Sequence, residues 1–178
     1  MIEIEERAER VLAHVPKWIW DGESLPVPVE DIADSVFRLR VREAEDLSSA
    51  PGAPALEPGS SLSGLLLPGR GEIWVNGPEA REWPGRRRFT IGHELGHWCM
   101  HRTDHVASIY CRSASVDPDE ERPERPVAER EADAFAAAVL MPAALLRKQY
   151  GRDRDFARLC TLFGASGAAM GRRLHAVI

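Results

Sequence analysis

The chain of 178 residues is long enough for one domain with a sizeable hydrophobic core, and short for two. Its composition is that of an ordinary globular protein, and a net charge of -5 argues against non-specific binding of nucleic acid by the whole molecule. Three cysteines without paired spacing form neither a disulfide framework nor a Cys-x-x-Cys metal site. The acidic N-terminus lacks the apolar core of a secretory signal, and the longest apolar run, Ala134 to Leu146, is too short to span a membrane. We therefore expect a cytoplasmic protein with no membrane partner.

The first forty residues predict two helices and a strand. Residues 2 to 15 carry apolar side chains at helical spacing, and Pro16 ends that helix. Residues 29 to 37 predict a second helix with an apolar inner face. Residues 37 to 42 alternate between apolar and basic side chains, which is typical of a half-exposed strand.

The next segment predicts a loop and a β-hairpin. Ser48 to Ser60 is rich in Ser, Ala, Pro and Gly, which indicates a flexible loop inside a domain. Residues 62 to 67 and 72 to 75 are β-rich runs separated by the turn sequence Pro68-Gly69-Arg70-Gly71. Asn76-Gly77-Pro78 is expected to end the second strand.

A helix expected over residues 84 to 101 carries the motif His93-Glu94-Leu95-Gly96-His97. Two histidines four residues apart lie one helical turn apart on the same face, so both imidazoles can reach one metal ion. Glu94 lies at the flank of that site, where a base is needed to take a proton from water that the metal activates. Two exposed histidines beside a solvated glutamate, with no metal, would show the same sequence motif. The apolar flanks at 89 to 91 and 98 to 100 instead predict a buried helix, whose polar groups need partners such as a metal.

A catalytic zinc ion takes three protein ligands and leaves one position open. The metzincin pattern would place Gly at 100 and His at 103, where this chain has Met100 and Thr103. His101 lies two turns, roughly 12 Å, from His93 along the helix axis, too far for one ion to bind both. We therefore interpret His101 as a structural or pocket-rim residue. His105 and acids further along the chain are other candidates.

Arg112 to Pro126 is acidic and proline-rich, and we expect it to be mobile. A helix over residues 127 to 141 follows, with Glu129 and Asp133 one turn apart. Glu129 can bind zinc while Asp133 accepts the outer N–H of a zinc-bound histidine, fixing its orientation and tautomer. Glu131, about 200° around the helix from Glu129, is expected to face away. The alternative is that these acids belong to a charged helix face in contact with solvent. That would explain one acid, but it explains less well why two acids one turn apart occur in an otherwise apolar helix.

The C-terminal residues predict three short helices. The first follows Pro142 and runs from 143 to 150. The others cover 155 to 162 and 166 to 177, joined by Gly164 in a left-handed turn and Ser166 as an N-cap, as in a helix-turn-helix.

The region from Leu146 to Ile178 carries seven Arg or Lys against two Asp. This basic surface could bind DNA, receive an acidic surface of a partner protein, or simply be solvated. Arg172 and Arg173 lie near the C-terminal end of the last helix, whereas base contacts usually come from the N-terminal part of a recognition helix. That position weakens the case for DNA.

The stretches Arg88-Phe-Thr-Ile-Gly-His-Glu-Leu-Gly-His97 and Glu129-Arg-Glu-Ala-Asp-Ala-Phe-Ala-Ala-Ala-Val-Leu-Met-Pro142 resemble the ImmA/IrrE family of metallopeptidases. The resemblance covers roughly residues 1 to 175. It implies an α+β fold: a mostly helical, zincin-like core related to that of thermolysin, a small antiparallel sheet and a helix-turn-helix-like C-terminal pair. We expect residues 1–142 to form the metallopeptidase domain and residues 143–178 a helical subdomain packed on it.

The resemblance also implies the roles of the site residues. His93, His97 and Glu129 would bind Zn2+. Glu94 would be the general base that later returns its proton to the leaving amine, and Asp133 would orient a histidine ligand. The sequence does not identify the group that stabilises the oxyanion, for which Tyr110, His105 and Tyr150 are candidates.

Family members are bacterial or phage regulators that cleave a helix-turn-helix repressor, often encoded nearby, in stress, mobile-element or toxin–antitoxin responses. The resemblance thus implies a zinc endopeptidase acting on such a repressor or on an antitoxin. The two long segments at 48–60 and 112–126 depart from the family pattern and bear on substrate access. The alternative is a non-proteolytic regulatory or toxin–antitoxin protein with structural zinc that acts by binding a repressor or DNA.

Overall fold

The computed structural model describes residues 2–53, 61–101, 110–113 and 126–178, the third of these ranges as backbone only. Its α-helices are α1 (Ile2–Ala13), α2 (Val29–Asp31), α3 (Gly77–Glu82), α4 (Pro84–His101), α5 (Val127–Leu140), α6 (Ala143–Arg152), α7 (Phe156–Phe163) and α8 (Gly167–Val177). Its strands are β1 (Arg40–Ala44), β2 (Leu62–Leu67), β3 (Glu72–Asn76) and β4 (Tyr110–Ser113). The predicted α+β class is confirmed.

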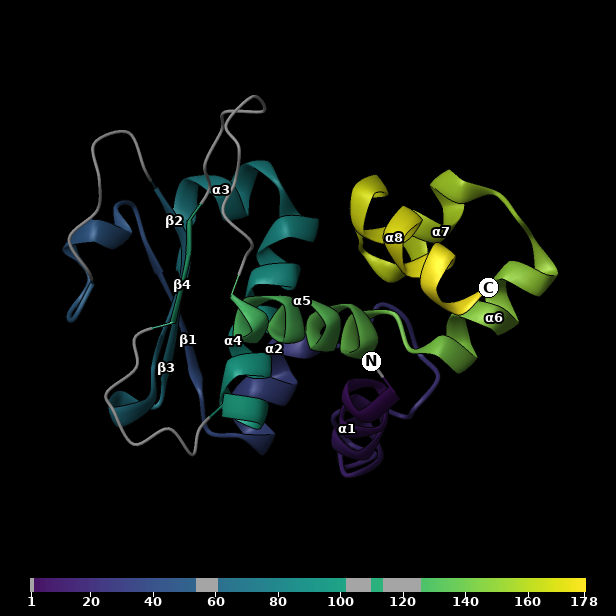
Figure 1. Ribbon diagram of the computed structural model, residues 1–178, viewed down its shortest axis with the longest axis horizontal. Helices are drawn as coiled ribbons and strands as arrows, with labels where there is room; N and C mark the ends of the chain where they lie inside the picture. Colours follow the sequence, from purple (N-terminus) through teal and green to yellow (C-terminus); the bar gives the residue numbers. More distant parts are fainter. Residues whose placement is uncertain (1, 54–60, 102–109, 114–125) are drawn as a thin grey trace.

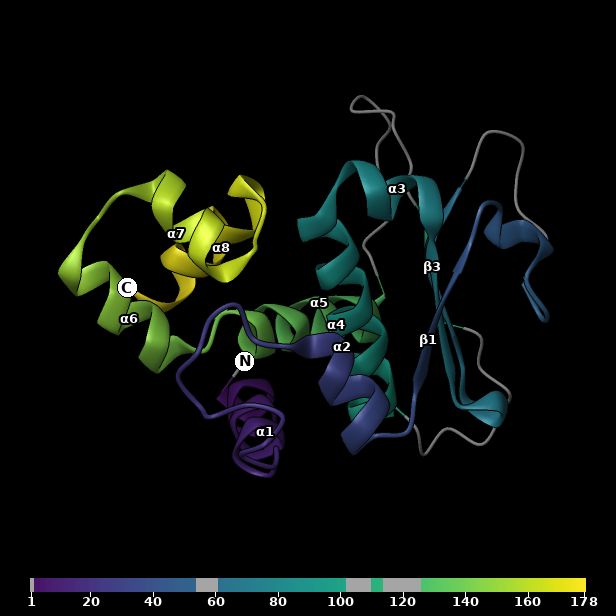
Figure 2. The ribbon, with the colours of Figure 1, turned by 180° about the vertical axis from the view of Figure 1, so that it is seen from behind.

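Figure 1 shows one sheet, seen edge-on, with α4 lying along it and α5 crossing α4 on the side away from the sheet. Helix α1 packs against α5, and α6, α7 and α8 gather at the other end of the molecule. From behind, α2 lies against α4 next to β1 (Figure 2). The helix that carries the His-Glu-x-x-His motif is therefore at the centre of the fold.

Most of the predicted helices begin and end within two residues of their expected limits. Helix α3 was not predicted, because Asn76-Gly77-Pro78 was interpreted only as the end of a strand. The Asn76 side chain accepts a hydrogen bond from the Glu79 backbone N–H, and Pro78 lies in the first turn. An asparagine N-cap followed by proline is a helix-start signal. Asn76 thus ends β3 and begins α3 at once.

The sheet has the strand order β1-β3-β2-β4 and is mixed. The predicted hairpin of β2 and β3 is confirmed, with Gly71 in the left-handed conformation (φ 63°) closing its turn. Strand β4 pairs antiparallel with the other edge of β2. Strand β1 instead runs parallel to β3, with Arg40 opposite Glu72. The wholly antiparallel sheet that we expected is corrected on this point, because β1 enters beside β3 and not beside its own sequence neighbour, β2.

Strand β1 also begins later than its alternating sequence predicts. The π-helical turn Ile32–Val36 continues α2, and Phe37 closes it by donating its backbone N–H to the Ile32 carbonyl oxygen. Arg38 then adopts a left-handed backbone conformation (φ 57°) that redirects the chain into the sheet. The apolar–basic alternation therefore starts inside a turn and continues into the strand.

Every residue of β2 is buried, because both faces of this strand are covered. Helix α4 covers one face. On the other face, Leu47 and Ala50 form a small second cluster with three leucines of β2. Leu47 belongs to a short 3-10 turn in which Asp46 accepts a hydrogen bond from the Ser48 backbone N–H. The beginning of the long Ser48–Ser60 segment is thus packed on the sheet, while residues 54–60 lie outside the described residues.

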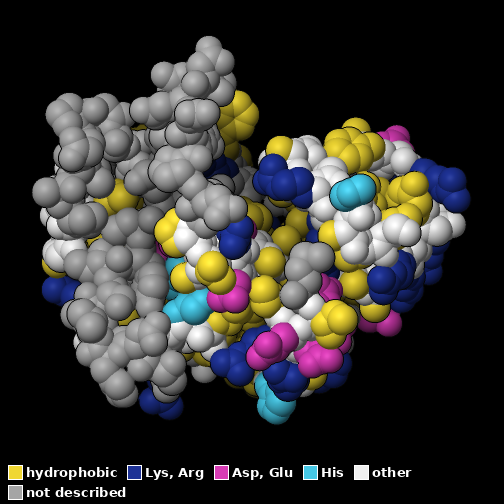
Figure 3. Space-filling model, viewed as in Figure 1, with side chains coloured by type: hydrophobic (Ala, Val, Ile, Leu, Met, Phe, Trp, Pro, Cys, Tyr) yellow, Lys and Arg dark blue, Asp and Glu magenta, His cyan; other side chains and the backbone are white. Residues whose placement is uncertain are grey.

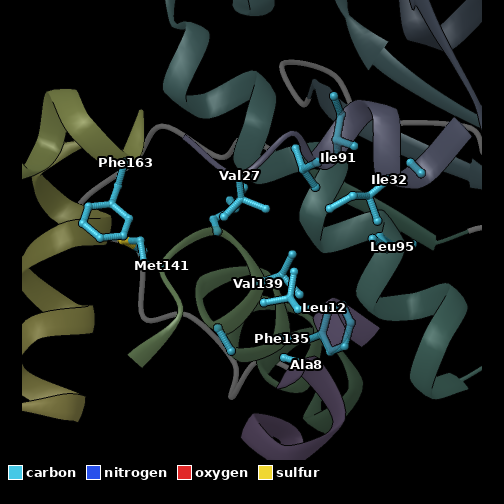
Figure 4. Close-up of a cluster of buried hydrophobic side chains, with 14 of the residues drawn as sticks. Ala8, Leu12, Val27, Ile32, Ile91, Leu95, Phe135, Val139, Met141 and Phe163 are labelled. Atoms are coloured by element: carbon cyan, nitrogen blue, oxygen red, sulfur yellow. The ribbon is translucent and has the colours of Figure 1, made fainter. Parts of the chain in front are cut away.

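The main hydrophobic core joins helices from both ends of the chain (Figure 4). Ile91 and Leu95 of α4 face Phe135 and Val139 of α5, and the cluster continues to Phe163 of α7. Burying one side chain of this size contributes about 1.5–3 kcal/mol. The core therefore holds α4 and α5 together firmly. The boundary at residue 142 stays a prediction, since α7 shares this core.

The first turns of α4 carry three consecutive arginines that bind three different parts of the fold. The Arg87 guanidinium donates two hydrogen bonds to the Glu30 carboxylate and a third, of 3.1 Å, to Glu43 of β1. The bonds from Arg87 hold the pKa of the Glu30 carboxyl below its ordinary value. Arg87 thus fixes α4 to both α2 and the edge of the sheet.

The two arginines on either side point elsewhere, because successive residues of a helix are rotated by about 100°. Arg86 donates to the Ser63 hydroxyl of β2 at 3.1 Å. Arg88 donates to the Val27 carbonyl oxygen at 2.6 Å. Together the three side chains set the position of α4 from three sides.

Arg173 of α8 connects the two ends of the chain. Its guanidinium donates two hydrogen bonds, of 2.8 and 2.5 Å, to the Glu5 carboxylate of α1, and a third of 2.9 Å to the Met141 carbonyl oxygen. The Arg173 side chain is only 6% exposed. This residue, counted in the sequence as part of a basic surface, is therefore a buried structural group.

We expect Arg173→Ala to lower the free energy of unfolding by about 3 kcal/mol or more, because it leaves the Glu5 carboxylate without its buried partner. The matched control is Arg172→Ala, which removes the exposed neighbour and should change stability by less than about 0.5 kcal/mol. Urea denaturation of both variants measures the difference. Equal effects would contradict the structural role of Arg173.

Candidate metal centre

Helices α4 and α5 approach closely because small residues line their contact. Gly92 and Gly96 of α4 face Ala136 and Ala132 of α5. A β-carbon added at Gly96 would lie 3.1 Å from both Cα and the carbonyl oxygen of Ala132, and one added at Gly92 would lie 3.3 Å from the β-carbon of Ala136. Larger side chains at these glycines would hold the helices apart. The polar residues beside them meet across the contact for this reason.

Three side-chain donor atoms converge at the crossing. His93 Nε2 lies 3.0 Å from His97 Nε2, and the two oxygens of Glu129 lie 3.3 Å from the first and 3.1 Å from the second. Adjacent ligands of a tetrahedral zinc ion are about 3.3 Å apart when its bonds are about 2.0–2.1 Å long. Both histidines are fully buried and the Glu129 side chain is 19% exposed. The three residues thus fit a zinc ion in number, chemistry and spacing.

Asp133 lies one turn beyond Glu129 and contacts the outer nitrogen of His93. The Nδ1–H group of His93 donates to the Asp133 carboxylate at 2.8 Å. A proton on Nδ1 leaves the lone pair of the neutral ring on Nε2, the atom that faces the other two donors. The arrangement is the one expected for a carboxylate that orients a metal-binding histidine.

His101 and Glu131 lie next to this cluster without joining it. His101 Nδ1 is 3.1 Å from Nδ1 of His97, on the opposite side of that ring from the three donor atoms. His101 Nε2 is 3.0 Å from the Glu131 carboxylate. Glu131 was expected to face away from Glu129, and it contacts a histidine of the same helix, α4, that Glu129 contacts. Sequence reasoning treated these two residues separately and missed their contact.

Glu94 is fully buried beside the donor atoms and lies against strand β2. A β-carbon at Gly64 of β2 would lie 2.9 Å from Glu94 Oε1 and 2.3 Å from the Thr90 methyl carbon. The strand can pass this closely only with glycine at that position. A glycine interrupting an apolar strand is a sign of such close approach, so Leu62-Ser-Gly-Leu contained a signal that the sequence analysis did not use.

The charges of the site favour a cation. Burial works to lower the pKa of His93, but hydrogen bonds to Asp133 and Glu129 and the charge of Glu94 outweigh it and raise that pKa to about 9. Burial lowers the pKa of His97, despite its bond to Glu129. The Glu129 carboxyl has a lowered pKa, because bonds to both histidines exceed the effect of burial. A metal-free site thus holds Glu129 ionised and a proton on His93, which a divalent ion would displace.

Of the three candidates for stabilising the oxyanion, Tyr150 is the one whose side chain the structure describes, and it lies away from the metal centre. Tyr150 lies on α6, past the far end of α5 from Glu129, and its ring packs against the Arg154 guanidinium at 5.3 Å (Figure 1). His105 and the side chain of Tyr110 lie outside the described residues, as do residues 114–125 of the acidic segment.

Helices α7 and α8 have the predicted turn, with Gly164 in the left-handed conformation (φ 60°) and Ser166 capping α8. Basic side chains are spread over this end of the molecule (Figure 3). The exposed residues in the first turn of α8 are Gly167 and Ala168, which carry no groups that read bases. The exposed Arg172 follows only in the second turn. The geometry therefore does not favour sequence-specific DNA recognition by α8.

A family model described as the IrrE N-terminal-like domain, Peptidase_M78, matches residues 70–175, which is more than half of the chain. The chain belongs to this Peptidase_M78 family. The match includes α4 and α5, and with them all the residues of the candidate metal centre. Peptidase_M78 is a family of zinc metallopeptidases, so its chemistry agrees with the donor set found at the helix crossing.

Among solved structures, the Peptidase_M78 chain is similar to a Mycobacterium tuberculosis transcriptional regulator, with a TM-score of 0.56 and 16% identity. The alignment covers 98% of this chain and 47% of the regulator, so the chain spans about half of that protein's length. At this identity the likeness concerns the fold alone. A search of curated protein sequences gave no match. None of the described helices is long and apolar enough to cross a lipid bilayer.

We expect Gly96→Ala to weaken zinc binding by this Peptidase_M78 domain and to lower its stability by about 1–3 kcal/mol, because α5 must move away from α4. The matched control is Gly171→Ala. An added β-carbon there meets no atom within 4 Å, so stability should rise by up to about 1 kcal/mol. Thermal unfolding and competition with a zinc chelator measure both effects. Tighter or unchanged zinc binding by Gly96→Ala would contradict the role of the close contact.

Proposed function

We propose that this protein is a zinc-dependent endopeptidase that cleaves a helix-turn-helix transcriptional repressor or antitoxin in the cytoplasm. The observation that carries the proposal is the convergence of His93, His97 and Glu129 at zinc-ligand spacing, with the Glu94 carboxylate buried beside them. Three protein ligands leave one position open, which is the arrangement of catalytic and not of structural zinc sites.

In this proposal His93 Nε2, His97 Nε2 and a Glu129 oxygen hold the zinc ion. When bound, zinc supplies the Lewis acidity that lowers the pKa of water and polarises the scissile carbonyl. Glu94 takes one proton from the attacking water as the oxygen of that water bonds to the carbonyl carbon. Glu94 then gives that proton to the amide nitrogen as the C–N bond breaks, which restores Glu94. The products are a carboxylic acid and an amine, and transfer of the remaining water proton between them gives a carboxylate and an ammonium group.

The surroundings of Glu94 suit a general base. Its carboxylate is shielded from solvent and lies against β2, on the residue next to His93. A carboxylate held in this position can take a proton from water and return it to the leaving amine. Asp133 supports the site by holding His93 in the tautomer with its lone pair on Nε2.

The regulatory setting of the proposal rests on the resemblance to ImmA/IrrE proteins. It draws support from the similar fold of the Mycobacterium tuberculosis protein that is named a transcriptional regulator. A repressor encoded next to this gene is the substrate to test first.

We expect Glu94→Gln to keep zinc and lose at least about 100-fold in the rate of repressor cleavage, because an amide cannot take the proton from water. Bound zinc is measured by metal analysis of the purified protein, and cleavage by incubation with the neighbouring repressor. The matched control Glu82→Gln changes an exposed acid of α3 and should cleave normally.

His93→Ala should lose both zinc and cleavage. If Glu94→Gln cleaved at the normal rate, Glu94 would not be the base. If the normal protein bound zinc and failed to cleave the repressor while still relieving repression, the non-proteolytic alternative would replace the peptidase.

A further inference from the structure

The two histidines of the proposed zinc site are held from outside in different ways. His93 contacts a carboxylate directly, through Nδ1 and Asp133. His97 contacts a third histidine, His101, at 3.1 Å between the two Nδ1 atoms. That third histidine contacts the Glu131 carboxylate at 3.0 Å. Each series of contacts begins at a histidine of α4 and ends at an acidic residue of α5.

The positions of the protons give the direction of each hydrogen bond along the path from His97 through His101 to Glu131. A carboxylate oxygen accepts, so the Nε2–H group of His101 donates to Glu131. With that proton on Nε2, the Nδ1 atom of His101 carries the lone pair that accepts a hydrogen bond. His97 therefore donates its Nδ1–H to His101, and its own lone pair lies on Nε2, facing His93 and Glu129. One proton in each of the two hydrogen bonds suffices for this arrangement.

We propose that His101 and Glu131 are positioning residues that fix the tautomer and orientation of His97 for zinc binding. Glu131 acts only through His101, and His101 acts through His97. The inference rests on the proposed zinc site and adds two residues to it. The three acids of one stretch of α5 then have separate tasks: Glu129 binds the ion, Asp133 orients the first histidine and Glu131 orients the second through a relay.

Burial indicates how strong this support is. The His101 side chain is 11% exposed and that of Glu131 is 38% exposed. The relay thus starts at the protein surface and becomes buried as it approaches His97, which is fully buried. Partners of this kind typically contribute 10–100-fold to metal affinity. The solvent exposure of Glu131 places its contribution near the lower end of that range.

The test is a double-mutant cycle on zinc affinity, measured by competition with a chromophoric chelator. Glu131→Gln and His101→Leu should each weaken zinc binding by about 10-fold or more. The double variant should bind zinc no more weakly than His101→Leu, because Glu131 has no route to His97 once His101 is gone. The matched control Arg130→Gln changes the exposed neighbour of Glu131 and should not weaken binding.

A second measurement reports geometry directly. Cobalt bound in place of zinc has a visible spectrum that depends on ligand orientation, and Glu131→Gln should change that spectrum while Arg130→Gln leaves it unchanged. If His101→Leu does not fold, this spectrum and the zinc affinity of Glu131→Gln decide the question. Normal affinity and an unchanged spectrum in that variant would overturn the proposal.

The proposal would also be overturned if the losses of zinc affinity in the two single variants added up in the double variant. Glu131 would then act by its charge and not through His101. Failure of the proposed zinc site itself would look different: the unmodified protein would bind zinc no better than His93→Ala does.

Discussion

The close contact between α4 and α5 is the constraint on which the rest of the structure depends. Two glycines on one helix and two alanines on the other let the backbones meet, and only then can side chains of moderate length reach across. The donor atoms of His93, His97 and Glu129 lie within 3.3 Å of one another because of this contact. On its other side, α4 meets β2 at Gly64 with equally little space. The helix is thus confined between a strand and a helix.

Because α4 packs closely on both sides, its two faces carry different functional groups. The face toward α5 carries the two histidines, and the face toward β2 carries Glu94. A base and a set of metal ligands can therefore lie on adjacent residues without competing for the same space. The arginines in the first turns lie outside this region and use charge to attach the helix to α2, β1, β2 and the segment before α2.

The sequence predicted the parts of the site that depend on spacing within one helix. His93 and His97 are four residues apart, as are Glu129 and Asp133, and helical geometry alone places each pair on one face. The sequence did not predict the contact of His101 with Glu131. It depends on the angle and distance at which two helices cross, which the periodicity of either helix does not contain. Likewise, the distance of His101 from His93 excluded it as a ligand but did not reveal what it touches.

The same distinction holds for the fold. The β2–β3 hairpin is local, so its strands and turn could be predicted from consecutive residues. The parallel pairing of β1 with β3 joins residues about thirty positions apart and follows from how the sheet assembles. Strand β4 lies in a polar, proline-rich region without an alternating pattern, and its pairing with β2 is again non-local. Helix α3 was missed although its start signal was present.

The two kinds of restraint on α4 respond to different conditions. Dissolved salt screens the attraction between Arg87 and its two exposed acids, whereas the steric contact of Gly96 with Ala132 has no charge to screen. High ionic strength therefore weakens the attachment of α4 to α2 and β1 through Arg87, while its steric contacts with α5 and with Gly64 of β2 persist. The positions of the two histidines relative to Glu129, and of Glu94 relative to β2, both depend on steric contacts and are then insensitive to the ionic composition of the surroundings.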